Sequence, residues 1–400
     1  MFIQILIAIL AGTLFGIITG LTPGIHINLV VTILVASVAA LTKYTNTLTL
    51  CIFIIALSIT HQFLEFIPSI FLGAPNPGTA LSILPGHRYL LTGNGLMAVK
   101  LSIIGCFFGL LVGCIFIYPL IIILPFIFQF IKSYMLIFLI IIVIAMILNN
   151  RKKSWAVFVF LLAGMAGLLT FSIPNLKEPL FPLLSGLFGT STLLISLNDK
   201  NNIPEQKEIQ TIDIDRKLMW KALFAGQFSA VFVSLFPGLS PAIAALFGMQ
   251  LTRNIGDHGY MILQGCINAS GFLLSIVTFY TINKARNGSV VGIQELIQNI
   301  GIKELLMFTV AAIVTAAIAV PLTLYMGKIF CKFLNKINYK KLIIAIISFI
   351  TILVFVMSGW IGLIVLITTT AIGIVPGIVK VTRTQAMGCL LLPVIIYYII

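Results

Sequence analysis

Long apolar runs constrain this chain more than any motif does. The stretches 2–20, 155–173 and 359–375 carry no charged residue, and each is close to the length of a bilayer crossing. Only 8% of the residues are charged and 60% are hydrophobic, whereas soluble domains carry roughly 25% charged residues. The sequence therefore predicts an all-α polytopic integral membrane protein with about 10–12 transmembrane or re-entrant helices.

This composition excludes a soluble enzyme, a nucleic-acid-binding protein and a disordered scaffold. It also excludes an outer-membrane barrel, because the apolar runs are continuous rather than alternating. The net charge of +14 comes from cations in short gaps between the runs, as at 151–153 and 328–341. That distribution is typical of cytoplasmic loops facing an anionic leaflet. The six scattered cysteines form no CxxC motif and are interpreted as small buried hydrophobes.

An internal repeat predicts two related halves. Residues 12–24 align with 226–238 at a constant offset of 214, so that Pro23-Gly24 matches Pro237-Gly238. Each copy is a helix of small residues that runs into Pro-Gly and continues as a short apolar piece, a pattern typical of secondary transporters. The predicted organisation is an N-terminal membrane half, a solvated polar linker that holds five of the ten acidic residues, and a C-terminal membrane half, over 1–197, 198–217 and 218–400.

The loop charges also predict an orientation. If 151–153, 198–217 and 328–341 are cytoplasmic, the two Pro-Gly elements enter the membrane from opposite sides, which is an inverted repeat. The same count places Met1 outside, as the start of a retained helix, provided that 120–131 lies in the interface.

The Pro-Gly breaks are the first candidate substrate site. Proline lacks a backbone donor and glycine permits unusual dihedral angles, so such pairs free backbone groups. In a bilayer these groups are tolerated only inside protein or beside a water-filled cavity, where they bind ions. The competing interpretation is ordinary turns or kinks. The predicted substrate-binding residues at the breaks are Pro23, Gly24, His26, Asn28, Pro237, Gly238 and Ser240.

The second candidate site is an acid and an imidazole in an apolar helix. His61 and Glu65 are four residues apart and share a helix face, and Glu65 is the only acid in the first 177 residues. We predict that this pair handles a coupling ion or proton. The alternative is a helix end, with Glu65 exposed at the interface before Pro68.

Further polar residues complete the predicted substrate site. His87-Arg88 is a candidate anion clamp or a plain juxtamembrane charge, and Asn268 is a candidate cavity wall or helix–helix contact. Asn76 is added from the same Pro- and Gly-rich segment as His87. Lys380 and Arg383, between two apolar stretches, are interpreted as snorkelling or cytoplasmic charges.

Enzyme motifs were also considered. The sequence has no HExxH, GxSxG, Walker A or GxGxxG motif, so no catalytic residue, cofactor or ATP-driven step is assigned. His61 and Glu65 with His26 or His87 could hold zinc, which leaves a membrane-embedded metalloenzyme as a weaker alternative, with no metal ligand assigned.

The chain resembles the large permease subunit of tripartite tricarboxylate transporters (TctA-like), and more closely the shorter archaeal TctA-related branch. The resemblance implies a secondary transporter of an organic anion, driven by an ion gradient across the cytoplasmic membrane. It also implies a small membrane subunit and an extracytoplasmic binding protein as partners. The sequence departs from the family at Ile25-His26 and Leu239-Ser240-Pro241, where those permeases usually carry more glycine. The residues that carry the resemblance are Gly12–Gly24, Gly226–Gly238, Phe71–Pro75, Leu84–Arg88 and Arg383–Pro393.

The leading expectation is a permease in the cell membrane that moves a small anion such as a carboxylate with H+ or Na+. Its main rival comes from a further resemblance, because the same broad group is similar to Pro-Gly-containing membrane proteins that return polyprenyl-phosphate carriers. That resemblance implies a polyprenyl-phosphate flippase, which needs an opening to the lipid beside the anion site. A structural or assembly membrane protein is the least specific alternative.

The predicted inverted repeat is tested by cysteine accessibility. Single cysteines introduced at 1 and 215 in a functional background are expected to react with impermeant reagents from opposite sides of the membrane. Labelling of both from the same side would contradict the inversion.

Overall fold

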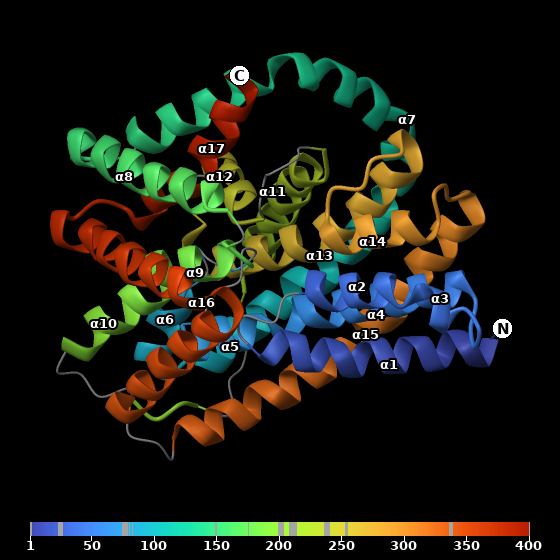
Figure 1. Ribbon diagram of the computed structural model, residues 1–400, viewed down its shortest axis with the longest axis horizontal. Helices are drawn as coiled ribbons and strands as arrows, with labels where there is room; N and C mark the ends of the chain where they lie inside the picture. Colours follow the sequence, from blue (N-terminus) through green and yellow to red (C-terminus); the bar gives the residue numbers. More distant parts are fainter. Residues whose placement is uncertain are drawn as a thin grey trace.

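The computed structural model describes residues 2–22, 27–73, 79, 81, 83–148, 150–174, 176–198, 204–207, 214–235, 241–252, 255–335 and 339–399. This part of the chain is helical and contains no strand (Figure 1). The helices are α1 (Phe2–Leu21), α2 (Ile27–Ala36), α3 (Val38–Leu41), α4 (Thr47–Leu64), α5 (Phe66–Phe71), α6 (Ile83–Leu91), α7 (Gly95–Leu148), α8 (Lys153–Ser172), α9 (Leu180–Leu184), the π-helix η2 (Ser185–Thr190), α10 (Ser191–Asn198), α11 (Arg216–Leu235), α12 (Pro241–Thr252), α13 (Gly256–Ile282), α14 (Gly288–Leu296), α15 (Ile302–Leu334), α16 (Tyr339–Val379), the 3-10 helix η3 (Arg383–Met387) and α17 (Gly388–Ile399).

The described helices confirm a polytopic membrane protein. Seven segments are long and apolar enough to cross a bilayer: Phe2–Leu21, Thr47–Phe71, Gly95–Phe130, Lys153–Ser172, Gly256–Ile282, Ile302–Leu334 and Ile343–Val379. Shorter apolar helices cover Leu136–Leu148, Leu180–Ile195 and Arg383–Ile399. Large apolar side chains on α1, α7 and α16 remain exposed, as expected for surfaces that face lipid.

Two long helices differ in how they are interrupted. Residues 120–131 continue α7, a single helix of 54 residues that holds Pro119 and Pro125 and arches along the upper edge of the molecule (Figure 1). In α16, by contrast, Gly359 adopts φ 66° and ψ −161°, which breaks the helix. Proline is tolerated in membrane helices because neighbouring groups satisfy the freed carbonyls, whereas the left-handed φ at Gly359 interrupts the helix itself.

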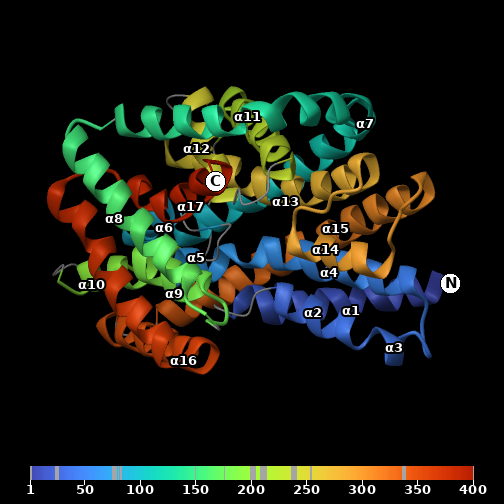
Figure 2. The same cartoon turned by 45° about the horizontal axis from the view of Figure 1, so that its top comes forward.

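Helices α4 and α13 form the centre of the molecule. The spans Thr47–Phe71 and Gly256–Ile282 are buried along nearly their whole length, unlike the lipid-facing helices around them. Both views show α4 and α13 enclosed by other helices (Figures 1 and 2). Because these two helices are shielded from lipid, they can carry polar side chains that a lipid-facing helix would not tolerate.

Glycines let the surrounding helices approach this centre closely. A Cβ built at Gly16 of α1 would lie 2.5 Å from Cβ of Thr60 in α4. A Cβ at Gly105 of α7 would lie 2.1 Å from the carbonyl oxygen of Ile262 in α13. Both distances are shorter than any real contact, so only glycine fits there. This is the small-residue packing by which membrane helices associate.

The first helices of the two predicted halves share their length and spacing. Helix α11 begins at residue 216 and ends at 235, in each case 214 residues after the corresponding end of α1 (2 and 21). Helix α12 likewise begins 214 residues after α2. Gly12 faces the carbonyl of Phe53 and Cβ of Ala56 on α4, while Gly226 faces the carbonyl of Leu263 and Cβ of Cys266 on α13. The boundaries of the halves and their inverted orientation stay predictions.

Part of the predicted linker is packed rather than solvated. Gln206 is only 2% exposed, and its backbone N–H donates to Oδ1 of Asn335 at 2.7 Å. Its side chain accepts from the N–H of Gly95 at 3.0 Å and donates to the carbonyl of Leu90 at 2.9 Å. The expectation of a solvated segment is wrong at this residue, because its amide satisfies backbone groups at two helix ends.

The glycine contacts predict that two Gly→Ala substitutions differ sharply in their effect on stability. Gly105→Ala forces α7 away from the α13 backbone and should cost about 1–3 kcal/mol, as overpacking does. Gly377→Ala is the control, since its nearest neighbour is Cδ1 of Ile195 at 3.5 Å and alanine favours a helix. Thermal unfolding in detergent should therefore show a lowered Tm for the first variant alone. Equal Tm values would show that the α7–α13 contact is not tight.

Candidate functional site

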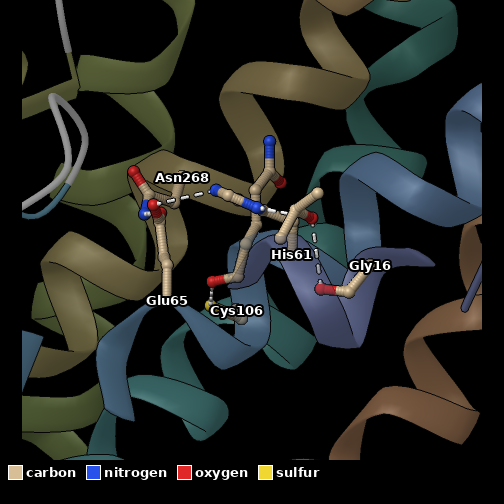
Figure 3. A network of polar contacts seen from close by, with 7 residues as sticks. Gly16, His61, Glu65, Cys106 and Asn268 are labelled. Atoms are coloured by element: carbon tan, nitrogen blue, oxygen red, sulfur yellow. Dashed lines mark hydrogen bonds and ion pairs between the residues drawn. The ribbon is translucent and has the colours of Figure 1, made fainter. Parts of the chain in front are cut away.

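A buried polar network links α1, α4 and α13 (Figure 3). Nδ1 of His61 lies 3.0 Å from the hydroxyl of Thr19, which donates to the carbonyl of Gly16 at 3.3 Å. Nε2 of His61 lies 3.5 Å from Oε2 of Glu65, within ion-pair range. The amide of Asn268 donates to Oε1 of Glu65 at 2.6 Å. The predicted acid–imidazole pair is therefore real and extends into the second half of the chain.

Glu65 lies where the helix is interrupted, between α4 and α5. Its N–H still donates to the carbonyl of His61 at 2.8 Å. Three residues later Pro68 lacks the N–H that would bond to the carbonyl of Leu64, which accounts for the interruption. Glu65 is only 5% exposed, so the alternative of a carboxylate exposed at the interface is wrong. A buried ionisable residue inside a membrane protein is a functional candidate by default.

The contact between Glu65 and Asn268 joins residues that are 203 positions apart. Asn268 is 4% exposed and lies on the fully buried α13. A hydrogen bond to a charged group contributes about 1.5–3 kcal/mol, more than a neutral one. This contact therefore couples the central helix of one predicted half to that of the other.

The geometry allows a proton to be held between His61 and Glu65. The Thr19 hydroxyl has one proton, and when it donates to Gly16, Nδ1 of His61 must carry its own proton to bond to Thr19. Nε2 then faces Oε2 of Glu65, and two lone pairs there would repel. A single proton between these two atoms would replace that repulsion by an attraction.

The predicted residues around the Pro-Gly breaks fall largely outside the described residues. This applies to Pro23, Gly24, His26, Asn76, Pro237, Gly238 and Ser240. Asn28 lies in α2, but its side chain is not described. The helix that leads to the first break does contact the network, because Thr19 on α1 lies four residues before Pro23.

The structure does not bring His87 and Arg88 together as a clamp. His87 is buried on α6, whereas the side chain of Arg88 is 64% exposed and pairs with Asp257 at 3.1 Å. An exposed pair of this kind contributes little to stability. Helix α6 packs on α5, where Gly86 meets Ile70, so His87 lies on the helix next to the one that follows Glu65. Anion binding by His87 and Arg88 stays a prediction.

Metal binding finds no support in the described part of the chain. It holds no group of three His, Cys, Asp or Glu side chains that could hold a metal ion. His26, one of the proposed zinc ligands, lies outside the described residues.

Sequence reasoning missed Thr19. It lies on the face of α1 that carries Gly16 and Gly20 and packs on α4, where Gly20 approaches Cβ of Leu64. A polar residue beside a stripe of small residues was the available signal, since that stripe marks the buried face of a membrane helix.

A double-mutant cycle should measure the link between the two central helices. Glu65→Ala and Asn268→Ala remove the partners one at a time and together, and their coupling is expected to be about 1.5–3 kcal/mol in detergent unfolding. Asn268→Ala combined with Glu295→Ala is the matched control, because Glu295 is exposed on α14. Zero coupling in both cycles would show that the 2.6 Å contact carries no energy.

Comparison with known proteins identifies the family of this chain. It is 29% identical over 355 residues to the uncharacterized protein MJ1079 of Methanocaldococcus jannaschii, covering 87% of this chain and 88% of that protein. No solved structure matches it. The family model described as "Tripartite tricarboxylate transporter TctA family" matches residues 6–388. Over nearly its whole length, therefore, this multi-pass membrane protein belongs to the TctA family of tripartite tricarboxylate transporter permeases.

Proposed function

We propose that the protein is a secondary active transporter that moves a small organic anion, such as a carboxylate, across the cytoplasmic membrane. An H+ or Na+ gradient drives it. The observation that carries the proposal is the buried network of His61, Glu65 and Asn268, in which one carboxylate is held between the two central helices.

The network suits ion coupling because a buried carboxylate without a bound proton, cation or hydrogen-bond donor has a high free energy. A carboxylate at this depth is tolerated only with a proton, a cation or donors around it. Ion binding and release at Glu65 therefore change the balance of contacts with His61 on α4 and Asn268 on α13. A ligand that alters the strength of an inter-helix contact shifts the equilibrium between helix arrangements.

The anion site belongs, in this proposal, to the Pro-Gly breaks that follow α1 and α11. Thr19 touches His61 just before the first break, so a change at the network reaches the helix that leads there. Helix termini and freed N–H groups bind anions, and unwound carbonyls bind cations. In this proposal the site that prefers the substrate anion therefore lies next to the site that prefers the coupling cation.

Membership of a tripartite family supports two protein partners. We propose a small membrane subunit and an extracytoplasmic binding protein that delivers the anion. Neither nucleic acid nor a redox cofactor has a role in this mechanism.

Ligand binding should be measured first, by thermal unfolding of the purified protein in detergent. The panel is citrate, succinate and a short-chain polyprenyl phosphate, each with and without sodium and at two pH values. A ligand at 100 times its Kd stabilises the folded state by about 2.7 kcal/mol, which is readily detected. A shift with a carboxylate supports the proposal, and a shift with the lipid phosphate alone would replace it by a lipid-carrier flippase.

Glu65→Gln then tests the coupling role. The amide keeps the shape of the side chain but binds neither a proton nor a cation as the carboxylate does. We expect uptake of the identified carboxylate into proteoliposomes to lose its dependence on the ion gradient and to fall at least tenfold. Glu295→Gln, the same change on the exposed face of α14, should behave as wild type. Full uptake with unchanged ion dependence in Glu65→Gln would refute the assignment.

A further inference from the structure

Two cationic turns meet at one place on the molecule. Oδ1 of Asn150 accepts hydrogen bonds from the N–H and the hydroxyl of Thr382, each at 3.0 Å. Asn150 directly precedes 151–153, which is Arg-Lys-Lys, and Thr382 lies between Lys380 and Arg383. Five cations therefore lie within three residues of one hydrogen-bonded contact. We call Arg151, Lys152, Lys153, Lys380 and Arg383 the cationic patch.

No carboxylate neutralises this patch among the described residues. The ion pairs among the described residues join His61 to Glu65 and Arg88 to Asp257, and neither includes a residue of the patch. Four of the five cations are exposed and Arg383 is partly buried. Like charges held this close repel one another, so a bound anion would stabilise the arrangement.

Arg383 gives the patch a specific donor set. One N–H of its guanidinium, at Nη1, donates to the hydroxyl of Thr192, a residue that is only 5% exposed. A guanidinium has five N–H donors, and the described residues offer the others no acceptor. The hydroxyls of its two sequence neighbours, Thr382 and Thr384, lie 2.9 Å from each other. A guanidinium held at one N–H keeps its remaining donors for the oxygens of a phosphate, which it can bind as a fork.

The position of the patch identifies the source of the phosphate. The candidate span of α8 begins at Lys153, and that of α16 ends at Val379, one residue before Lys380. Both views place α8 and α16 together on the side of the molecule opposite the N-terminus (Figures 1 and 2). Cations at the ends of membrane spans lie at the level of the lipid headgroups, and basic pockets there bind anionic lipids. We propose that the cationic patch binds the phosphate of an anionic phospholipid, with Arg383 as its fork.

The test uses the full-length protein in detergent with dioctanoyl phosphatidylglycerol as the probe. Native mass spectrometry and thermal unfolding both report its binding. Arg383→Gln is expected to weaken binding at least tenfold, and Arg383→Lys less, since it keeps the charge but loses the fork. Arg151→Gln changes an exposed side chain and should weaken binding about fivefold. It therefore keeps the test valid if Arg383→Gln fails to fold.

Three comparisons control the result. Lys43→Gln removes an exposed cation two residues after α3, a helix that Figure 1 draws near the N-terminus and far from α8 and α16, and it should leave binding unchanged. Dioctanoyl phosphatidylcholine, which carries no net charge, should bind at least tenfold more weakly. Equal binding of both lipids, or equal effects of Lys43→Gln and Arg151→Gln, would overturn the proposal. Inorganic phosphate that competes with the lipid and depends on Arg383 would replace it by a free-anion site.

Discussion

The rest of the structure depends on the close approach of helix backbones at glycine. A bilayer supplies no hydrophobic drive between helices, so they associate through van der Waals contact and buried hydrogen bonds. Gly16 brings α1 against α4, and Gly105 brings α7 against α13, at distances that exclude any Cβ. These contacts shield α4 and α13 from lipid along nearly their whole length.

That shielding is the condition for the polar network. A carboxylate and an imidazole exposed to hydrocarbon would each be costly, but Glu65 and His61 lie between helices and have Asn268 and Thr19 as partners. The same packing makes the network responsive. A contact that joins α4 to α13 is sensitive to the charge at Glu65. The helices that lead to the two Pro-Gly breaks are α1 and α11, which pack on α4 and α13. The buried charge therefore depends on the helix packing, and the proposed transport depends on the buried charge.

Charges outside the centre are distributed differently. The acid of the network is buried, whereas the cations of the patch around Arg383 lie at the ends of the spans. Gln206 fixes the linker against Gly95 and Asn335, so the connection between the predicted halves is anchored to helix ends. The buried network and the cationic patch are thus separate, and each can be altered without removing the side chains of the other.

The sequence by itself determined the membrane class, most helix positions and the pairing of His61 with Glu65. Runs of apolar residues can satisfy their backbone only as helices in lipid, and residues four apart share a helix face whatever the fold. It did not determine the continuity of α7 through Pro119 and Pro125, the burial of Gln206, or the contacts of Glu65 with Asn268 and of His61 with Thr19. Those depend on which helices approach each other. Partners 42 and 203 residues apart leave no periodic signal in one sequence, so only the tertiary structure brought them together.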